Sequence, residues 1–121
     1  MISLFVDKNI AKAKTLAKEF YTDAKYFEDA KEKIFSNCLQ FIGETSLLKE
    51  PGSCYPFTFL DGYINEPLLL TRDKRNQFHC LSNVCTHRGN ILVNQSCKAS
   101  NIRCKYHGRL FDLDGKFKSM P

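Results

Sequence analysis

The sequence predicts an α+β fold, in which a helical N-terminal arm (residues 1–48) precedes an antiparallel β domain (residues 49–121). Two differences in composition support this division. The first 48 residues are rich in Ala, Lys, Glu and Phe, contain no Pro, and have Gly43 as their only Gly, which favours helix. From about residue 51, clusters of Gly, Pro, Asp and Asn separate short apolar runs, as in a domain of short strands joined by turns.

Two helices are expected in the arm. Asp7 is a candidate N-cap for a first helix that extends to Phe20, and Thr22 or Asp23 is a candidate N-cap for a second. Four apolar residues of the second segment recur at helical spacing and predict one buried stripe that packs on a neighbouring sheet. They are Phe27, Ala30, Ile34 and Cys38.

Short strands are expected in the second region, at residues 57–60, 68–71, 78–81, 102–104 and 110–113. Residues 68–81 are expected to form one hairpin, and Asp114-Gly115 to turn a second hairpin with a two-residue loop. The chain ends at Met120-Pro121, directly after that hairpin. Because small antiparallel units usually close with a returning strand, we expect that the last strand is lacking and that the sequence is a fragment of a longer chain.

Two motifs carry the chemistry, and each contains one Cys, one His and a following Gly. They are C-T-H-R-G at residues 85–89 and C-K-Y-H-G at residues 104–108. The two thiols and two imidazoles could hold one Zn²⁺. Zinc fingers, however, pair Cys with Cys and His with His, whereas each motif here carries one of each. That arrangement suits a binuclear centre, and a [2Fe–2S] cluster with two Cys on one iron and two His on the other is a Rieske centre. The predicted ligands are Cys85, His87, Cys104 and His107.

The same motifs carry a family resemblance. Together with F-D-L-D-G at residues 111–115 and Met120-Pro121, they make residues 80–121 closely resemble the N-terminal part of Rieske non-haem iron oxygenase α subunits, of the ring-hydroxylating and choline-monooxygenase-like branches. The resemblance implies a Rieske (ISP-like) β domain. Arg109 departs from the Trp that many ring-hydroxylating members have at this position. Asn90 and Tyr106 stand where respiratory Rieske proteins have the cysteines of a disulfide between the loops, so the resemblance is to the oxygenase type.

The resemblance also implies a function and partners. The domain would transfer one electron at a time, receiving it from a ferredoxin or flavin reductase. It would pass the electron to a mononuclear Fe(II) in an oxygenase catalytic domain, within a homotrimer. Once His87 and His107 are assigned to the cluster, only His79 remains, so this chain alone should not be catalytic. A stand-alone Rieske ferredoxin is the alternative, and a structural zinc module is a weaker one.

Composition limits the other classes of function. The net charge is +5, but the basic residues are spread along the chain and there is no Trp, which argues against nucleic-acid binding. No apolar run is long enough to span a bilayer, and the start lacks the features of a signal peptide, so a cytoplasmic location is expected. The remaining cysteines are expected to be small hydrophobes or exposed thiols, because none forms a C-x-x-C pair. They are Cys38, Cys54, Cys80 and Cys97.

Overall fold

The computed structural model describes residues 4–121. The described residues form two compact units, which divide between residues 41 and 42. None of the helices within the described residues has the length and apolarity needed to cross a bilayer. Residues 42–48, assigned to the arm from their composition, fall in the second unit. There the 3₁₀ helix η2 (Thr45–Leu48) contacts two strands, and Leu48 is buried.

The first unit is helical over a shorter stretch than predicted. It contains α1 (Lys18–Thr22), α2 (Ala24–Lys33) and the 3₁₀ helix η1 (Phe35–Asn37). Asp23 caps α2 as predicted, since its side chain accepts a hydrogen bond from the backbone amide of Lys25 at 2.9 Å. The predicted helix from Asp7 is wrong. The side chains of Asp7 and Asn9 accept hydrogen bonds from backbone amides two residues on, a local pattern that competes with helix formation.

The predicted stripe on the second helix does not stay on one helical face. The helix ends at Lys33 and continues as η1, so Ile34 and Cys38 leave the 3.6-residue period on which the stripe depended. The helix is instead lined by ion pairs of Lys31 with Glu28 (3.0 Å) and Lys33 with Asp29 (2.9 Å).

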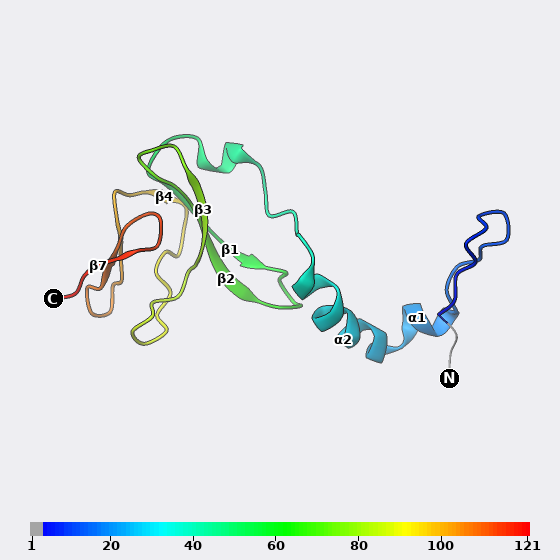
Figure 1. Ribbon diagram of the computed structural model, residues 1–121. Coiled ribbons are helices and arrows are strands. Elements are labelled where there is room, and N and C mark those ends of the chain that lie inside the picture. The colour runs from blue at the N-terminus through cyan, green and yellow to red at the C-terminus, as the bar shows by residue number, and fades with distance from the viewer. Residues whose placement is uncertain (1–3) are drawn as a thin grey trace. The chain divides into compact units, whose positions relative to one another are not determined.

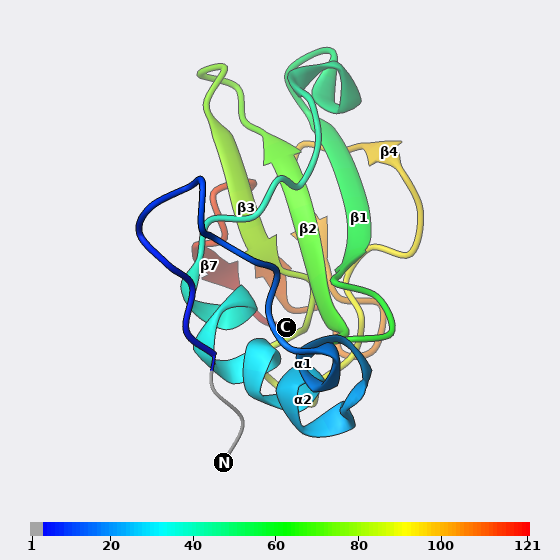
Figure 2. The ribbon, with the colours of Figure 1, turned by 90° about the vertical axis from the view of Figure 1, so that its right-hand side faces the viewer.

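The second unit is built from two antiparallel sheets, which confirms the predicted fold class. The first sheet has the order β3-β2-β1-β4, and the second has the order β5-β6-β7 (Figures 1 and 2). The strands of the first sheet are β1 (Ser53–Phe59), β2 (Glu66–Arg72), β3 (Phe78–Ser82) and β4 (Cys97–Lys98). Those of the second are β5 (Ile102–Arg103), β6 (Leu110–Phe111) and β7 (Phe117–Ser119).

Two hairpins of the same construction join neighbouring strands. In the β2–β3 hairpin the Asp73 amide donates to Gln77 O, and Asn76, at a φ of +63°, donates to Asp73 O. In the β6–β7 hairpin Asp112 and Gly115 take the places of Asp73 and Asn76. Both loops therefore have three residues, the last of which is left-handed, a common hairpin form. The hairpin over residues 68–81 is confirmed, whereas the predicted two-residue loop at Asp114-Gly115 is wrong.

The core lies between the two sheets and extends to the sequence motifs. Leu69 on β2 is completely buried, and Phe111 on β6 is 7% exposed. The same apolar cluster includes Cys85 and Cys104, each 2% exposed. The two cysteines of the motifs are thus anchored in the packed interior of the unit.

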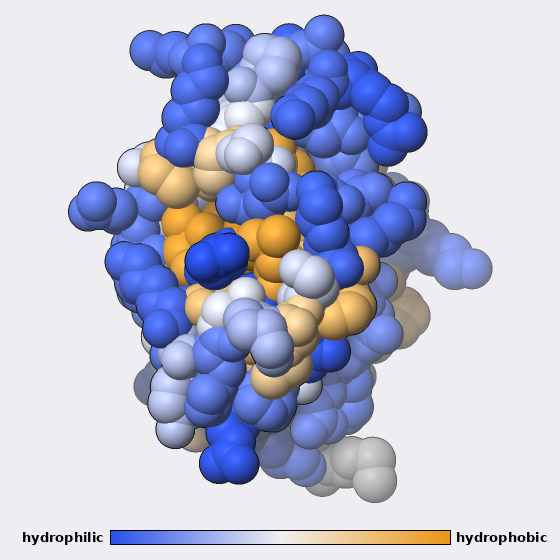
Figure 3. All heavy atoms as spheres, turned by 90° about the vertical axis from the view of Figure 1, so that its left-hand side faces the viewer, coloured by the Kyte–Doolittle hydropathy of each residue, from blue (hydrophilic) through white to orange (hydrophobic). Residues whose placement is uncertain are grey.

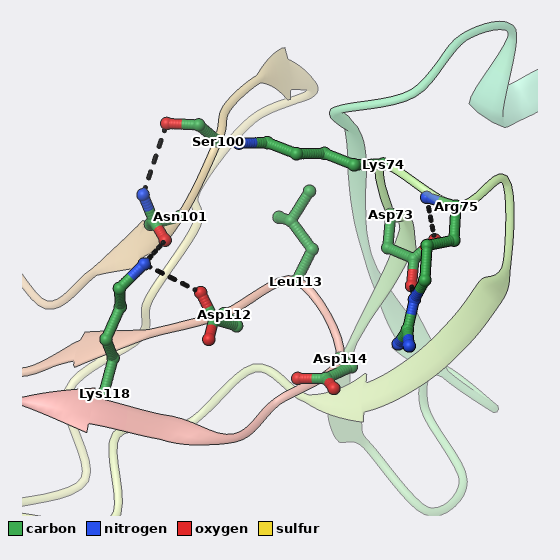
Figure 4. Close-up of a pocket in the computed structure, with 9 residues that line it drawn as sticks. All are labelled: Asp73, Lys74, Arg75, Ser100, Asn101, Asp112, Leu113, Asp114 and Lys118. Atoms are coloured by element: carbon green, nitrogen blue, oxygen red, sulfur yellow. Dashed lines mark hydrogen bonds and ion pairs between the residues drawn. The ribbon is translucent and has the colours of Figure 1, made fainter.

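A polar pocket lies among the turns of the two hairpins and the turn after β4. Figure 4 shows Lys118 between Asp112 and Asn101, with Nζ 3.2 Å from the Asp112 carboxylate and 3.1 Å from Asn101 Oδ1. Asp73 bonds backbone amides of its own turn. The pocket lining includes no residue of the two Cys–His motifs, and its carboxylates are paired with neighbouring groups.

Candidate metal centre

The two motifs fold into loops with the same backbone bonding. In the first, the Cys85 amide donates to Asn90 O (2.8 Å) and the Gly89 amide donates to Cys85 O (3.0 Å). In the second, the Cys104 amide donates to Arg109 O (2.8 Å) and the Gly108 amide donates to Cys104 O (3.0 Å). The histidine occupies the third position of one loop and the fourth position of the other. The loops lie side by side at the lower left of the ribbon in Figure 1.

Each loop needs a glycine at its fifth position. Gly89 and Gly108 have φ values of +69° and +76°, a region that residues with a Cβ adopt only at a cost. At Gly108 a Cβ would also lie 2.9 Å from the Pro121 ring, whereas at Gly89 nothing lies within 4 Å. The glycines noted from sequence therefore have a conformational role in both loops, and a packing role in one.

The four candidate ligands fall into two pairs. Cys85 and Cys104 are buried, and their side chains are in hydrogen-bonding contact with each other. His87 and His107 are exposed, and their ring centroids are 4.8 Å apart. Within residues 4–121, no three His, Cys, Asp or Glu side chains are placed to hold one metal ion. Two thiols and two imidazoles in separate pairs match the donor set of a binuclear cluster with two Cys on one iron and two His on the other.

Local hydrogen bonds and charges prepare the donors for ligation. The backbone amides of Tyr106 and His107 donate to Cys104 Sγ and hold the pKa of that thiol below its ordinary value. Desolvation and the nearby His107 and Arg88 lower the pKa of His87. Both shifts favour the states in which these groups bind metals, namely thiolate and neutral imidazole. The donor set therefore suits a metal cluster.

Residues around the donors have roles that the sequence did not reveal. Asn90 was noted only as a position without a disulfide, but its Nδ2 lies 3.8 Å from Cys104 Sγ and joins the second loop to the first. Arg109 is partly buried, with its guanidinium carbon 4.8 Å from the ring centroid of Phe117. Neither contact has a sequence signal, because both join segments that are distant along the chain.

Tyr106 packs against the ring of His107 with centroids 3.7 Å apart and remains 59% exposed. His79 has a structural place on β3, where its Nε2 lies 3.2 Å from Asp73 Oδ2. Arg88, Arg103 and Lys105 are exposed.

Comparison with known proteins identifies the family. The family model described as the Rieske [2Fe-2S] domain matches residues 40–121. The chain belongs to the Rieske [2Fe–2S] domain family. The family implies a [2Fe–2S] cluster, in agreement with the cofactor predicted from the two motifs.

Curated relatives are oxygenase subunits much longer than this chain. Choline monooxygenase of Amaranthus tricolor is 36% identical over 96 residues, which cover 79% of this chain and 21% of the relative. The carnitine monooxygenase oxygenase subunit of Acinetobacter baumannii is 36% identical over 102 residues, covering 84% of this chain and 26% of the relative. The chain therefore spans about a quarter of the length of these proteins.

Solved structures agree. The quaternary ammonium Rieske monooxygenase CntA, in complex with an inhibitor, is 31% identical with a TM-score of 0.80, covering 98% of this chain and 33% of that chain. Naphthalene 1,2-dioxygenase with indole bound is 27% identical with a TM-score of 0.68, covering 78% of this chain and 21% of that chain. This chain is thus homologous to the Rieske part of Rieske oxygenase α subunits.

Proposed function

We propose that Cys85, His87, Cys104 and His107 hold a Rieske [2Fe–2S] cluster and that the domain is the electron-entry part of a Rieske oxygenase. The pairing of buried thiols with exposed imidazoles carries this proposal. When bound, such a cluster accepts and releases one electron at a time. The thiols supply anionic ligands from a position closed to water. The imidazoles form the part of the site that a partner can reach.

The catalytic chemistry of the whole protein is assigned to residues beyond these 121. A mononuclear iron site of the facial-triad type needs two His and one carboxylate. The remaining histidine, His79, is paired with Asp73 on β3. The relatives that are 36% identical are named for choline and carnitine. This favours a quaternary ammonium substrate for the whole protein over an aromatic one.

The charge around the site indicates the kind of electron donor. From Lys74 to Phe111 the chain carries seven basic residues and no Asp or Glu. The exposed cations nearest the ligands in sequence are Arg88, Arg103 and Lys105, and the ion pairs formed within residues 4–121 include none of them. Unpaired surface cations of one sign speed association with a partner of the opposite charge. We therefore assign the donor to the acidic ferredoxins or acidic flavin reductases.

The surface beside this site also has apolar character. Figure 3 shows the face that carries β7 and the C-terminal end, where hydrophobic residues gather at the centre within a rim of hydrophilic ones. Phe117 on β7 is 53% exposed and Met120 is 43% exposed. An apolar patch with a charged rim is the usual composition of a protein docking surface.

Two sets of variants test the proposal. His107→Ala should lose bound iron, whereas the neighbouring Tyr106→Phe should retain it, because only the first removes a donor. Lys105→Glu should lower the rate of reduction by an acidic ferredoxin several-fold, and the rate for the original chain should fall with rising salt. Lys74→Glu makes the same charge change in the β2–β3 turn and is the matched control. Full iron content in His107→Ala would contradict the ligand assignment, and equal rates for Lys105→Glu and Lys74→Glu would contradict the donor assignment.

A further inference from the structure

Two cysteines outside the metal centre face each other at the edge of the first sheet. In the pairing of β1 with β4, Cys54 lies directly opposite Cys97. Opposite residues of antiparallel strands project to the same face, with Cα atoms about 4.5–5.5 Å apart. Disulfides bridge Cα separations of about 4.4–6.8 Å. The register therefore places the two thiols where a bond can form without a change of backbone.

Several contacts fix this register. The Ala99 amide donates to Gly52 O at 2.9 Å, and Lys98 Nζ lies 2.8 Å from Glu50 Oε2. Gly52 has a φ of +91°, and a Cβ there would lie 3.0 Å from Ala99 O. The glycine thus permits the close approach of β4 to β1. A slip of the short strand would break both polar contacts.

The two thiols differ in their exposure to solvent. Cys54 is 2% exposed, and its Sγ donates to Gly52 O at 3.6 Å. Burial and the adjacent Cys97 thiol raise the pKa of Cys54 to about 12, so this thiol stays protonated at neutral pH. Cys97 is exposed and lines a hollow of about 420 Å³ together with Arg103 and Lys105. The cations make this hollow suitable for an anionic reagent.

We propose that Cys54 and Cys97 form a reversible disulfide, with an anionic low-molecular-weight disulfide of the glutathione type as oxidant. The Cys97 thiolate attacks one sulfur of the oxidant, forms a mixed disulfide and releases one thiolate. The Cys54 sulfur then attacks the Cys97 sulfur, and the second thiol leaves with the Cys54 proton. In total, two protein thiols are oxidised and one disulfide is reduced to two thiols.

The bond would fix the segment that joins the two ligand loops. β4 lies between the first motif, which ends at Gly89, and the second, which begins at Cys104. Two hydrogen-bonded residues are a weak anchor for a connection of this length. A covalent link to β1 would hold this connection, and with it the spacing of the two ligand loops. The bond itself does not depend on the proposed function, because it joins other residues, whereas its effect on the metal centre rests on that function.

Peptide mapping tests the bond directly. The iron-loaded chain is treated with glutathione disulfide, its free thiols are blocked, and it is digested with trypsin. Cys54 falls in the peptide of residues 50–72 and Cys97 in that of residues 89–98, each with no other cysteine. The expected product is these two peptides linked, with the loss of two hydrogens, and separated again by dithiothreitol. A stable glutathione adduct on Cys97 with Cys54 still free, or no change at either residue, would overturn the proposal.

Matched variants test what the bond does. Cys80→Ser removes an exposed cysteine from β3 and should still form the linked peptides, whereas Cys97→Ser should not. After oxidation, iron should pass to a chelator more slowly from the Cys80→Ser protein than from the Cys97→Ser protein. Equal rates would show that the bond does not hold the connection between the loops.

Discussion

Thr71 tests how the two sheets of the β unit are joined. This residue on β2 is completely buried, and its hydroxyl donates to the carbonyl oxygen of Leu113 in the β6–β7 turn. Leu113 is itself 4% exposed. Thr71→Val keeps the shape of the side chain and removes the donor. The Leu113 carbonyl then loses this bond inside the core.

The expected loss of stability in Thr71→Val is large for a change of one atom in the side chain. Depriving a buried carbonyl of its partner costs about 2 kcal/mol. For a folding unit of this size, that corresponds to a fall in Tm of about 10 °C. Thr71→Ser keeps the hydroxyl and loses one methyl group, at a cost of about 1 kcal/mol. The valine variant should therefore be less stable than the serine variant, although valine is the more apolar residue.

Urea unfolding of the whole chain, followed by circular dichroism, measures both variants. The expected urea midpoints fall in the order original, Thr71→Ser, Thr71→Val, from highest to lowest. If Thr71→Val were as stable as Thr71→Ser, packing of the methyl groups rather than the hydrogen bond would join the two sheets. The bond also supports the site, since β6 pairs with β5 and β5 leads directly into Cys104.

Substitutions at Asp73, Gly89 and Leu69, each with a matched comparison, test other parts of the structure. The backbone amide of Gln77, with His79, holds the pKa of Asp73 at about 2, below the ordinary 3.8. This carboxylate therefore stabilises the fold above about pH 4, and the destabilisation by Asp73→Asn should shrink as pH falls from 4 towards 2 in acid-unfolding curves. The exposed Asp61→Asn should show no such trend. Gly89→Ala should lower the free energy of unfolding, measured with urea, by about 1 kcal/mol, because φ is positive at this residue. Gly89→Asn should lower it less, since Asn tolerates that region, and equal midpoints for the two variants would contradict this. Leu69→Ala should lower the free energy of unfolding by about 3 kcal/mol, because Leu69 is fully buried. A smaller loss than that of Thr71→Ser would contradict the position of Leu69 at the centre of the core.

β2 and β3 were predictable from sequence, because the patterns that mark a strand and its turn are local. The runs at 68–71 and 78–81 lie within β2 and β3, and turn residues at 73–76 mark the hairpin between them. β4 was not predicted, because a strand of two residues is too short to show an alternation of apolar and polar side chains. Cys97 also lies among polar residues, as it would in a loop. Its pairing with β1 depends on Gly52 and on the Lys98–Glu50 ion pair, which are contacts between distant segments.

The candidate site was predictable from spacing, but its support was not. Two Cys–His motifs with a Gly at the same fifth position gave the donor set, because each loop is a short local structure. The bond from Asn90 to Cys104 and the stacking of Arg109 on Phe117 depend on how the loops and the last hairpin pack. The helical arm was predicted least well. Helical spacing of apolar residues cannot show where a helix ends, and α2 ends before Ile34.

The most direct test of the central claim is the EPR spectrum of the anaerobically purified, dithionite-reduced chain, with iron and zinc counted on the same sample. Ligation by Cys85, His87, Cys104 and His107 predicts the rhombic signal and low average g value of a mixed His/Cys cluster, with the two irons per chain of a [2Fe–2S] group. A chain without this signal that binds one zinc ion instead would contradict the account and make the site a structural metal module.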